Sequence, residues 1–581
     1  MENAEIAGVF NEIADLLEIK GENPFRIRSY RNAALVVEGW PESFRTLFEK
    51  GAENLDGIPG IGASIREKII EMLTTGSCKF HDEIVKEFPP GIFDILKLSG
   101  VGPKKAALFY NKLGIGTVDG LEKAVNAGAL QGLAGMGKKS EQKILKAIKD
   151  FRALSGRFNL SIAIPCATAL MDYLKKTEGV QRVEAAGSLR RWKESVGDLD
   201  ILAVSSDPDH VMGAFTAHPE VRDIVSKGRA KSTVILRAGL QVDLRVIEEE
   251  SFGAALQYFT GSKAHNIALR DRAKRRGLKI SEYGVFTVKS GGEKRIAGRT
   301  EEEVYKAVGL KWIPPELREN TGEIEAAGQG SLPVQIEVSD IRGDLHTHTD
   351  ESDGADSLEE MAKEAMKRGY EYLAITDHSK AVGIAHGLDA KRALRQIKAI
   401  DAYNEKLKKA GKKFRLLKGS EVDIRADGSL DHPAEVLDGL DCVVASIHSG
   451  FTMERERMTA RIIKAIRSGK INIIAHPTGR LIGAREPFEV DMEEVMDEAE
   501  KYGVALELNS YPDRLDLKDS HLRLAREKGI PVAVSTDSHS RRHFDNLLFG
   551  IHTARRGWLE KKDILNTRTL KELMSFLEKK R

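Results

Sequence analysis

The sequence contains very little cysteine. Its 581 residues include only three, Cys78, Cys166 and Cys442, which lie far apart and form no CxxC pair. Such isolated thiols argue against a disulfide framework and against a thiolate zinc site, and they are typical of a reducing compartment.

Long apolar runs are also missing. No stretch approaches the roughly 18 apolar residues that a membrane span requires, and the opening MENAEIAGVFNEIADLL is acidic, unlike a signal peptide. We therefore expect a cytoplasmic protein with no membrane partner. The length favours three or four domains over a single core.

A large net charge is absent too, since the formal value is +2. The charge is nevertheless uneven, because residues 1–320 are net basic and residues 321–581 are net acidic. The stretch KAHNIALRDRAKRRGLK (263–279) has seven basic residues against one acidic residue. Such a patch is either a phosphate-binding surface or the solvated face of a helix.

The character of the chain changes twice along its length. Residues 1–150 have the pattern of short amphipathic helices joined by glycine turns, whereas residues 158–312 alternate β-branched runs with helical segments. Residues 320–340 have the Gly- and Ser-containing composition of a linker. After it, strand and helix patterns alternate regularly, which favours a parallel sheet or barrel.

Three segments of the helical part resemble one another: LDGIPGIGASIREKI (55–69), LKLSGVGPKKAALFY (96–110) and LQGLAGMGKKSEQKIL (130–145). Each has two glycines that permit a tight turn before a new helix, whose free N–H groups form a phosphate cradle. These segments look like helix-hairpin-helix motifs, which hold the DNA backbone without reading bases. The candidate DNA contacts are Gly60, Gly62, Gly100, Gly102, Lys104, Lys105, Gly135 and Gly137.

The middle of the chain carries three strand-like carboxylates. Asp198 and Asp200 are two residues apart in GDLDILAV, so they share one face of a strand, and Asp243 lies in the strand-like QVDLRVI. Neighbouring carboxylates repel one another unless divalent cations lie between them. With the Gly187-Ser188 turn and two arginines upstream, they predict two-metal phosphoryl transfer. A solvated strand end is the alternative.

The last part of the chain places polar groups where strand-like runs end. Because the carboxyl ends of barrel strands form one rim, these groups are expected to converge. Imidazole and carboxylate donors without sulfur suit Mn, Zn or Fe, and nine donors exceed the needs of one ion. Two or three ions are therefore expected, held by His346, His348, Asp353, His378, Glu421, His448, His476, Asp537 and His539.

The succession GSLRR, GDLD, VDLR and YFTGS (187–262) resembles the family X DNA polymerases, the DNA polymerase beta group. The resemblance covers residues 1–312 and implies that Asp198, Asp200 and Asp243 bind two Mg²⁺ or Mn²⁺ ions, with Asp243 accepting the primer proton. It implies that the nucleotide binds Gly187, Ser188, Arg191 and Gly197 through its triphosphate, Tyr258 and Phe259 through its sugar, Asn266 and Arg270 on the minor-groove side, and Gly261 in the same site.

The same resemblance singles out Lys68. It matches the lysine that forms a Schiff base with an abasic sugar in lyase-active members, although Ser64 stands where a neighbouring lysine is usual. A lysine of lowered pKa performs that chemistry. The alternative for Lys68 is a phosphate contact.

Residues 340–575 resemble the PHP (polymerase and histidinol phosphatase) domains, and every ligand position of that pattern is filled. The resemblance implies a metal-dependent phosphoesterase on a distorted seven-stranded (β/α) barrel. Fused to a polymerase, it implies a 3′–5′ exonuclease or 3′-end-processing activity. Arg457, Arg480 and Arg485 are candidate phosphate contacts, with surface arginine as the alternative for each.

The predicted multidomain fold joins an all-α helix-hairpin-helix region, an α/β nucleotidyltransferase palm, a small α/β thumb-like region and the barrel. Its expected divisions are 1–80 and 81–155 (helical), 156–248 (palm), 249–318 (thumb-like), 319–339 (linker) and 340–575 (barrel).

The sequence thus predicts a gap-filling repair polymerase joined to a 3′-end phosphoesterase, possible activities of the latter including abasic-site cleavage and 3′-phosphate removal. Gapped or primer-template DNA and deoxynucleoside triphosphates are the expected partners, and a monomer is expected. Two alternatives stay open. The barrel acts on small phosphoesters, as histidinol phosphatases do, or the chain is a non-catalytic scaffold for DNA ends.

Overall fold

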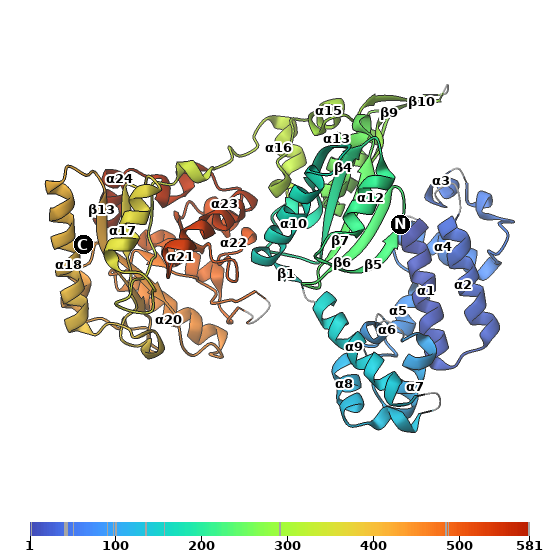
Figure 1. Cartoon of the computed structure of the whole chain (residues 1–581), viewed down its shortest axis with the longest axis horizontal. Coiled ribbons are helices and arrows are strands. Elements are labelled where there is room, and N and C mark those ends of the chain that lie inside the picture. The colour runs from blue at the N-terminus through green and yellow to red at the C-terminus, as the bar shows by residue number, and fades with distance from the viewer. Residues whose placement is uncertain are drawn as a thin grey trace. The chain divides into compact units, whose positions relative to one another are not determined.

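The computed structural model of the chain describes all residues except 2, 40–43, 50, 90, 97, 99–100, 134–135, 156, 290–291, 483–484, 486 and 579–581. The chain divides into two compact units, Met1–Ser155 and Gly156–Arg581, coloured along the chain from blue to red in Figure 1.

The first unit is helical, and the residues described in it contain no strand. One apolar core, which includes Phe10, Phe44 and Phe109, holds its helices together. The helices are α1 (Asn3–Lys20), α2 (Pro24–Gly39), α3 (Phe44–Glu49), α4 (Ala63–Thr75), α5 (Lys79–Val85), α6 (Ile92–Leu96), α7 (Pro103–Leu113), α8 (Val118–Asn126) and α9 (Lys138–Ser155).

The second unit begins with a five-stranded sheet of order β2-β4-β7-β6-β5, in which β4 and β7 are parallel and the other pairs antiparallel. Its strands are β2 (Val180–Ala185), β4 (Asp198–Ser205), β5 (Val221–Lys227), β6 (Lys231–Leu236) and β7 (Gln241–Ile247). Beside it lie the short pair β1 (Phe158–Asn159) and β3 (Ser195–Val196) and the helices α10 (Leu160–Lys175), α11 (Gly187–Arg190) and α12 (Pro208–Thr216).

The alternation of side chains along β4 determines what each face of this sheet carries. Leu199 and Ile201 belong to the core shared with α10 and α12, whereas Leu202 packs with Phe252 in a separate cluster. Because successive side chains of a strand point to opposite faces, Asp198 and Asp200 lie on the same face as Leu202. The two carboxylates therefore avoid the larger core.

A three-stranded antiparallel sheet of order β10-β9-β8 follows the palm-like sheet. The elements of this region are α13 (Phe252–Thr260), α14 (Lys263–Lys274), β8 (Leu278–Ser281), β9 (Gly284–Lys289), β10 (Gly292–Ala297), α15 (Glu301–Ala307) and α16 (Glu323–Gln329). Helix α16 lies within residues 319–339, the expected linker, and its Ile324 and Ala327 are buried in the core of this region. The domain boundaries stay predictions.

Seven parallel strands, paired in chain order from β11 to β17, build the last part. A parallel bridge between Thr347 and Ser538 connects the segments that follow the first and the last strand. The strands are β11 (Gly343–Asp344), β12 (Tyr372–Ile375), β13 (Arg415–Asp423), β14 (Cys442–Ser446), β15 (Ile473–Ile474), β16 (Ala505–Asn509) and β17 (Val532–Ser535). The predicted seven-stranded barrel, and with it the predicted fold class, is confirmed.

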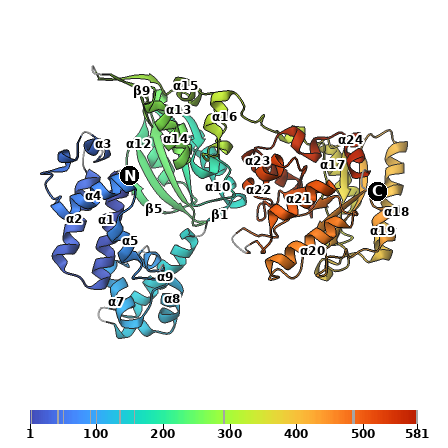
Figure 2. The ribbon, with the colours of Figure 1, turned by 180° about the vertical axis from the view of Figure 1, so that it is seen from behind.

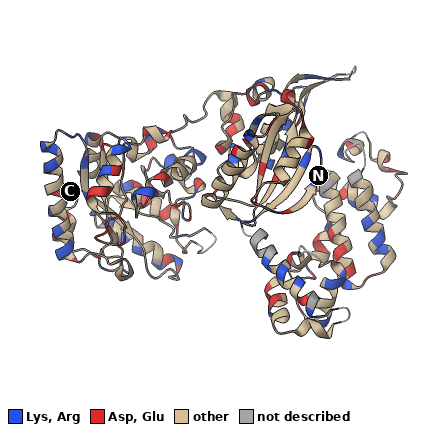
Figure 3. Ribbon diagram, in the orientation of Figure 1, with Lys and Arg blue, Asp and Glu red and all other residues tan. Residues whose placement is uncertain are grey.

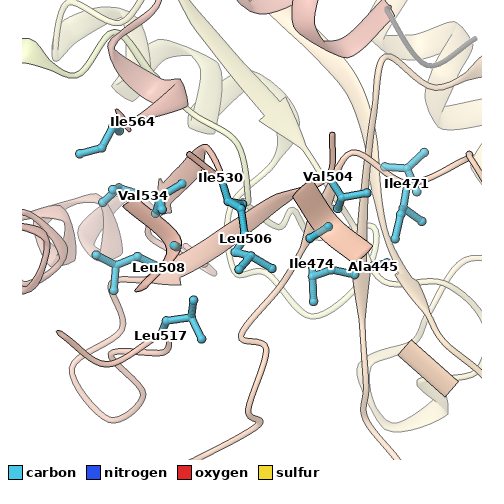
Figure 4. Close-up of a cluster of buried hydrophobic side chains, with 14 of the residues drawn as sticks. Ala445, Ile471, Ile474, Val504, Leu506, Leu508, Leu517, Ile530, Val534 and Ile564 are labelled. Carbon is cyan, nitrogen blue, oxygen red and sulfur yellow. The ribbon is translucent and has the colours of Figure 1, made fainter. Parts of the chain in front are cut away.

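Helices surround these strands, as the view from behind in Figure 2 shows. Leu506, Leu508 and Val534 belong to the large core between the strands and the helices, part of which Figure 4 draws. The helices are α17 (Leu358–Lys367), α18 (Ala390–Lys409), α19 (Ala434–Gly439), α20 (Arg455–Arg467), α21 (Met492–Tyr502), α22 (Asp519–Glu527), α23 (Leu547–Arg556) and α24 (Leu570–Glu578).

A second, smaller core fills the inside of the barrel. It contains Leu417 and Val444 from the strands, Leu345 directly after β11, and Leu573 and Leu577 from α24. Because the interior is packed with side chains, the polar groups that follow the strands are confined to the carboxyl end of the barrel. Among the described residues, no helix is long and apolar enough to cross a membrane.

Candidate metal centres and nucleotide site

The three predicted palm carboxylates lie on two adjacent strands. Asp200 of β4 is in register with Asp243 of β7, and Asp198 precedes Asp200 on the same face. Asp243 is 9% exposed; it accepts a hydrogen bond from Thr233 Oγ1 (2.7 Å) and forms an ion pair with Lys231 Nζ (2.6 Å). The palm sheet thus brings all three aspartates together where β4 and β7 begin, a place called the palm edge below.

Electrostatic repulsion at this edge is visible in the acidities. Burial, together with the charges of Asp198 and Asp243, raises the pKa of Asp200 to about 6. Burial and the charge of Asp243 likewise raise the pKa of Asp198. Divalent cations would remove the repulsion, since an adjacent positive charge favours ionised carboxylates. The residues present therefore fit a cation site.

The turn after β2 passes very close to this edge. Gly187 has φ +62°, and a Cβ atom there would lie 2.4 Å from Asp200 Oδ2. Only glycine fits, because another residue would meet both the left-handed backbone and the carboxylate. Ser188 follows in the short helix α11, and the space beside Gly197 is open within 4 Å.

The two arginines of this turn have different partners. Arg190 donates to both carboxylate oxygens of Glu301 at 2.8 Å and to Thr260 Oγ1 at 2.8 Å. Both terminal nitrogens of its guanidinium are therefore engaged within the chain. Arg191 donates from Nε to Glu319 Oε1 at 3.0 Å. Arg191, the predicted nucleotide contact, is therefore held by one carboxylate that a triphosphate would have to replace or accompany.

The same turn contacts the barrel part of the unit. Arg556 of α23 donates from Nη1 to the Arg191 carbonyl (2.7 Å) and to Glu319 Oε1 (3.1 Å). The indole of Trp192 stacks on His552 with ring centroids 3.6 Å apart and planes 4° apart. Helix α23 therefore buttresses the backbone that carries the predicted nucleotide residues.

The remaining predicted nucleotide residues lie on α13 and α14. The rings of Tyr258 and Phe259, at the end of α13, are 5.1 Å apart and nearly perpendicular. Asn266 donates to the Tyr258 carbonyl at 2.7 Å, and Arg270 follows one turn later on α14. At Gly261, a Cβ atom would lie 3.3 Å from Arg191 Nη1. Gly261 thus lies beside Arg191, and Asn266 beside Tyr258.

Two of the predicted hairpin turns are described where they start a helix. Gly62 precedes α4 and Gly102 precedes α7, and neither turn has a side-chain cap for its helix. No side chain therefore competes with an anion for the N–H groups of Ala63 and Ser64 in α4 or of Lys104 in α7, which begins with Pro103 and so lacks one donor. Lys104 and Lys105 lie in the first turn of α7. Gly60 has φ +88°, and Gly137 directly precedes α9. Gly100 and Gly135 lie outside the described residues.

Basic and acidic residues both occur on the helices of this unit, as Figure 3 shows, whereas the charged residues of α7 are all lysines. Lys68, on α4, donates to Ser64 Oγ at 3.2 Å and lies 5.4 Å from the centre of the Phe80 ring. Ser64, which stands where a second lysine is usual in the family, is thus the hydrogen-bond partner of Lys68.

All nine predicted barrel donors meet at the carboxyl end of the strands. Ligand atoms of His348, Asp353, His378 and His539 lie within 4.8 Å of one another, as do those of two overlapping groups. The other groups are His346, His348 and Asp537, and His378, Glu421 and His448. Among the described residues, these are the groups that come together this closely, and the palm aspartates are not among them.

Glu421 lies at the centre of the barrel donors and is 1% exposed. Its carboxylate oxygens lie within 3.5 Å of a nitrogen of each of five imidazoles, at 3.3 Å from His346, 3.5 Å from His348, 2.9 Å from His378, 3.3 Å from His448 and 3.0 Å from His476. Although burial alone would raise it, the neighbouring His378 and His346 hold the pKa of Glu421 well below its usual range. A carboxylate so placed is suited to bridge two cations.

Several ring nitrogens of this cluster are buried without a hydrogen-bond partner. They are His348 Nδ1 and His476 Nδ1; His346 Nε2 and His378 Nδ1 likewise make no hydrogen bond, but they lie 3.3 and 2.9 Å from a Glu421 oxygen. Burial lowers the pKa of His348 to about 3 and that of His476 to about 4, which favours neutral rings, whereas the carboxylates of Glu421 and Asp353 outweigh burial and raise the pKa of His378 to about 10. A bound cation would favour the deprotonated form of His378 as well. A neutral imidazole with an unshared lone pair is the form that binds a metal, and the residues present therefore fit a multi-metal centre.

The predicted ligands are oriented by residues outside the predicted ligand set, of which the sequence indicated only Asn509, as a polar group at the end of a strand-like run. Glu507 accepts from His346 Nδ1 (2.7 Å) and from the His476 backbone N–H (2.6 Å), while Asp423 lies 3.2 Å from His448 Nδ1. Asn509 donates to Asp537 Oδ2 at 3.0 Å. Hydrogen bonds from ligating histidines to carboxylates are usual around protein metal sites. The presence of Glu507 and Asn509, two residues apart in a buried strand, is the sequence feature that could have indicated this orienting role.

Two of the ligands have a strained backbone. His476 has φ +28° and Asp537 has φ +53°, in a region that residues with a Cβ atom rarely adopt. Each such residue costs on the order of 1–3 kcal/mol and persists where the surrounding structure fixes it. The strain indicates that directing these two side chains lowers the stability of the barrel.

Comparison with known proteins assigns families to most of the chain. Family models match residues 1–78 (helix-hairpin-helix domain), 92–150 (SAM-like helix-hairpin-helix tandem), 255–319 (DNA polymerase beta thumb) and 344–511 (PHP domain). A Bacillus subtilis (strain 168) protein named "DNA polymerase/3'-5' exonuclease PolX" is 40% identical over 581 residues, which is 100% of both chains.

Shorter relatives match only part of the chain. Proteins named "Probable phosphatase" are 35% identical over 205 residues in Acetivibrio thermocellus and 29% identical over 210 residues in Shewanella oneidensis. Each match covers 34% of this chain and 78% or 75% of the relative.

Proposed function

The chain belongs to the family X DNA polymerases that carry a C-terminal PHP domain, and from this premise we propose how its residues divide two reactions at a DNA 3′ end. It is a DNA-directed DNA polymerase with 3′–5′ exonuclease activity, and the resemblance predicted from the sequence is confirmed. We propose that it fills short gaps during base excision repair, with gapped or primer-template DNA and deoxynucleoside triphosphates as substrates.

We assign the polymerase reaction to the palm edge. Asp198, Asp200 and Asp243 would hold two Mg²⁺ or Mn²⁺ ions, which when bound supply charge neutralisation at the triphosphate and activate the primer hydroxyl. Asp243 would accept the primer proton, and the Gly187 turn with Arg191 would hold the triphosphate. The pKa of about 6 at Asp200 supports this assignment, because burial and the neighbouring Asp198 and Asp243 disfavour its ionised form, and bound cations would favour it.

The other predicted residues would position the nucleotide and the DNA. Tyr258 and Phe259 would line the sugar, and Asn266 and Arg270 would contact the minor-groove side of the new base pair. The uncapped helix ends at Gly62 and Gly102 would receive backbone phosphates, since such contacts position DNA without reading its sequence.

Lys68 keeps two interpretations, a lyase nucleophile and a phosphate contact. Borohydride reduction of the protein on abasic-site DNA distinguishes them, because only a Schiff base is trapped as a covalent adduct. An adduct that disappears in Lys68→Ala supports the lyase, and the absence of an adduct in the wild type supports the phosphate contact.

We assign the exonuclease reaction to the barrel centre. The nine donors would hold two or three Mn, Zn or Fe ions, which when bound supply a metal-activated water and charge neutralisation at the phosphodiester. The single observation that carries this assignment is the buried Glu421 with five imidazoles within 3.5 Å of its oxygens. The exposed Asp353 and the half-buried His448 and His539 form the accessible side of the cluster.

Glu421→Gln tests the barrel assignment. The substitution removes the bridging charge, so the purified protein should lose bound metal, and shortening of a labelled 3′ end should fall on the order of 1,000-fold, the equivalent of several kcal/mol of lost metal-ion catalysis. The control is Asp427→Asn, an exposed carboxylate of the same barrel. Unchanged metal content and shortening in Glu421→Gln would contradict the assignment.

The relatives named phosphatases favour a second candidate substrate, a small phosphoester. They match 34% of this chain, whereas the polymerase relative matches all of it, so DNA ends are the preferred substrate. Hydrolysis of histidinol phosphate faster than that of a DNA 3′ end would reverse this preference. The cytoplasmic location and the monomeric state stay proposals.

A further inference from the structure

One arginine beside the barrel cluster has no assigned role. Arg514 lies in the loop after β16, with its Nε 3.8 Å from Asp537 Oδ2 and its side chain 21% exposed. Within the described part of the chain, its guanidinium makes no side-chain hydrogen bond, because 3.8 Å exceeds hydrogen-bond distance. A guanidinium has five donors, so this one is available to an acceptor that comes from outside the chain.

The arginines suggested by the sequence as phosphate contacts are occupied or distant. Arg480 donates from Nε to the Arg514 carbonyl at 2.9 Å and pairs with Glu194 at 2.8 Å. Arg485 donates to the Gly479 carbonyl at 2.8 Å and lies 4.1 Å from the centre of the Phe451 ring. Arg457 is exposed on α20. Arg514 is therefore the better candidate at this cluster.

The loop that carries Arg514 is fixed from the palm side. Leu515 is fully buried in the apolar core of the palm and has φ +41°. Asn159 of β1 donates to the Pro512 carbonyl at 2.8 Å, and Arg480 donates to the carbonyls of both Arg514 and Leu515. A leucine in the left-handed region persists only where its surroundings fix it. The palm thus holds Arg514 at the edge of the barrel cluster.

The carboxylate nearest Arg514 is already engaged. Asp537 Oδ2 accepts from Asn509 Nδ2 at 3.0 Å, and Asp537 Oδ1 lies 3.1 Å from His348 Nε2. Asp537 is thus directed toward the histidines, and Arg514 Nε, 3.8 Å from Oδ2, lies beyond hydrogen-bond distance of it. A planar fork of N–H groups matches phosphate oxygens, which it binds through two parallel charge-assisted bonds.

We propose that Arg514 binds a phosphoryl oxygen of the DNA 3′ end at the barrel centre, and that the palm positions it there through Asn159 and Leu515. The proposal rests on the proposed phosphoesterase function of the barrel. The ligand is a phosphate oxyanion, and Arg514 is a substrate-binding residue on a loop that contacts both the palm and the barrel.

The test uses the full-length chain loaded with Mn²⁺ and freed of excess metal. Calorimetry gives the Kd of inorganic phosphate, the probe, and assays on a labelled oligonucleotide give KM and kcat for shortening. In Arg514→Gln, both Kd and KM should rise roughly 10- to 100-fold, the range for hydrogen bonds to a charged group. Arg514→Lys, which keeps the charge but not the fork, should fall between, and Arg457→Gln is the matched control.

Two further readouts separate binding from structure. Mn²⁺ content and gap-filling extension should be unchanged in Arg514→Gln, while Asn159→Ala should raise the phosphate Kd severalfold by loosening the loop. An unchanged phosphate Kd in Arg514→Gln, or loss of Mn²⁺ from it, would overturn the proposal. If the wild type shortens no DNA end, the proposed exonuclease assignment fails, and the phosphate Kd values still decide the role of Arg514.

Discussion

The palm edge and the barrel centre prepare for metal ions in different ways. The palm offers three carboxylates of graded exposure: Asp198 is exposed, Asp200 half-buried and Asp243 buried. The barrel offers nine donors, and His346, His348 and Glu421 among them are at most 1% exposed. We propose that the palm site is completed by oxygens of the substrate, whereas the barrel supplies all of its predicted ligands from within the chain.

This difference indicates how each site controls its reaction. A nucleotidyl transferase gains from a site that binds its second ion only with the triphosphate, because the ion then arrives with the substrate. A phosphoesterase gains from a preformed ion cluster, because the free-energy cost of the strained backbone at His476 and Asp537 then belongs to folding and not to substrate binding. The following substitutions test whether the two sites are independent.

The largest effect should come from the palm carboxylates. Asp200→Asn removes a charge from the cation site, so extension should fall on the order of 1,000-fold, while shortening stays unchanged. Primer extension on gapped DNA measures it, with the exposed Asp223→Asn of β5 as control. A parallel loss of shortening would mean that the two sites are not independent.

The acidity of Asp200 gives the palm site a pH dependence. Asp200 has a pKa of about 6 and must lose its proton before it binds a cation, so Mg²⁺ affinity should fall as the pH falls through 6. The decrease is about tenfold for each pH unit below that value, as expected for one linked proton. The Mg²⁺ concentration for half-maximal extension between pH 5 and 8 measures it, and a constant value would contradict it.

Gly187→Ala tests the close approach of the turn to Asp200. The new Cβ would meet Asp200 Oδ2 at 2.4 Å with φ at +62°, so the KM for nucleotide should rise roughly tenfold, from about 1–2 kcal/mol of backbone strain. The matched control is Gly213→Ala in α12, where a Cβ meets no atom within 4 Å. Equal nucleotide KM values for the two variants would refute the close approach.

The smallest effect should reach both activities equally. Replacing Lys104 and Lys105 by alanine removes two cations from the first turn of α7, so DNA affinity should fall a few-fold, and the salt dependence of binding should decrease by about two units of slope. Fluorescence anisotropy at several salt concentrations measures it. The control pair is Lys175 and Lys176, exposed at the end of α10; an equal effect there would remove the hairpin from the DNA interface.

Local patterns predicted much of the two sites. The two-residue spacing of Asp198 and Asp200, and of His346 and His348, is local, and a strand or strand end fixes where such pairs point. Glu507 was not predicted because it lies within a strand rather than at the end of one. Helix α16 escaped because its Gly- and Ser-rich surroundings resemble a linker, although Ile324 and Ala327 are buried.

Contacts between distant segments could not be predicted in this way. Arg191 is paired with Glu319, 128 residues away, and no local pattern indicates that partner. Arg514 owes its position to Asn159, more than 350 residues earlier in the chain, and to the burial of Leu515 in the palm core. Such positions follow from tertiary packing, which sequence spacing does not contain.

The central claim is that two separate sites act on one DNA 3′ end. The most direct test incubates the protein with a one-nucleotide-gapped duplex that carries a labelled 3′ end and Mn²⁺, with and without nucleotides. Asp243→Ala should lose extension and keep shortening, and the double substitution His346→Ala/His348→Ala should do the reverse. Loss of both activities in either variant, or shortening that survives the double substitution, would contradict the account.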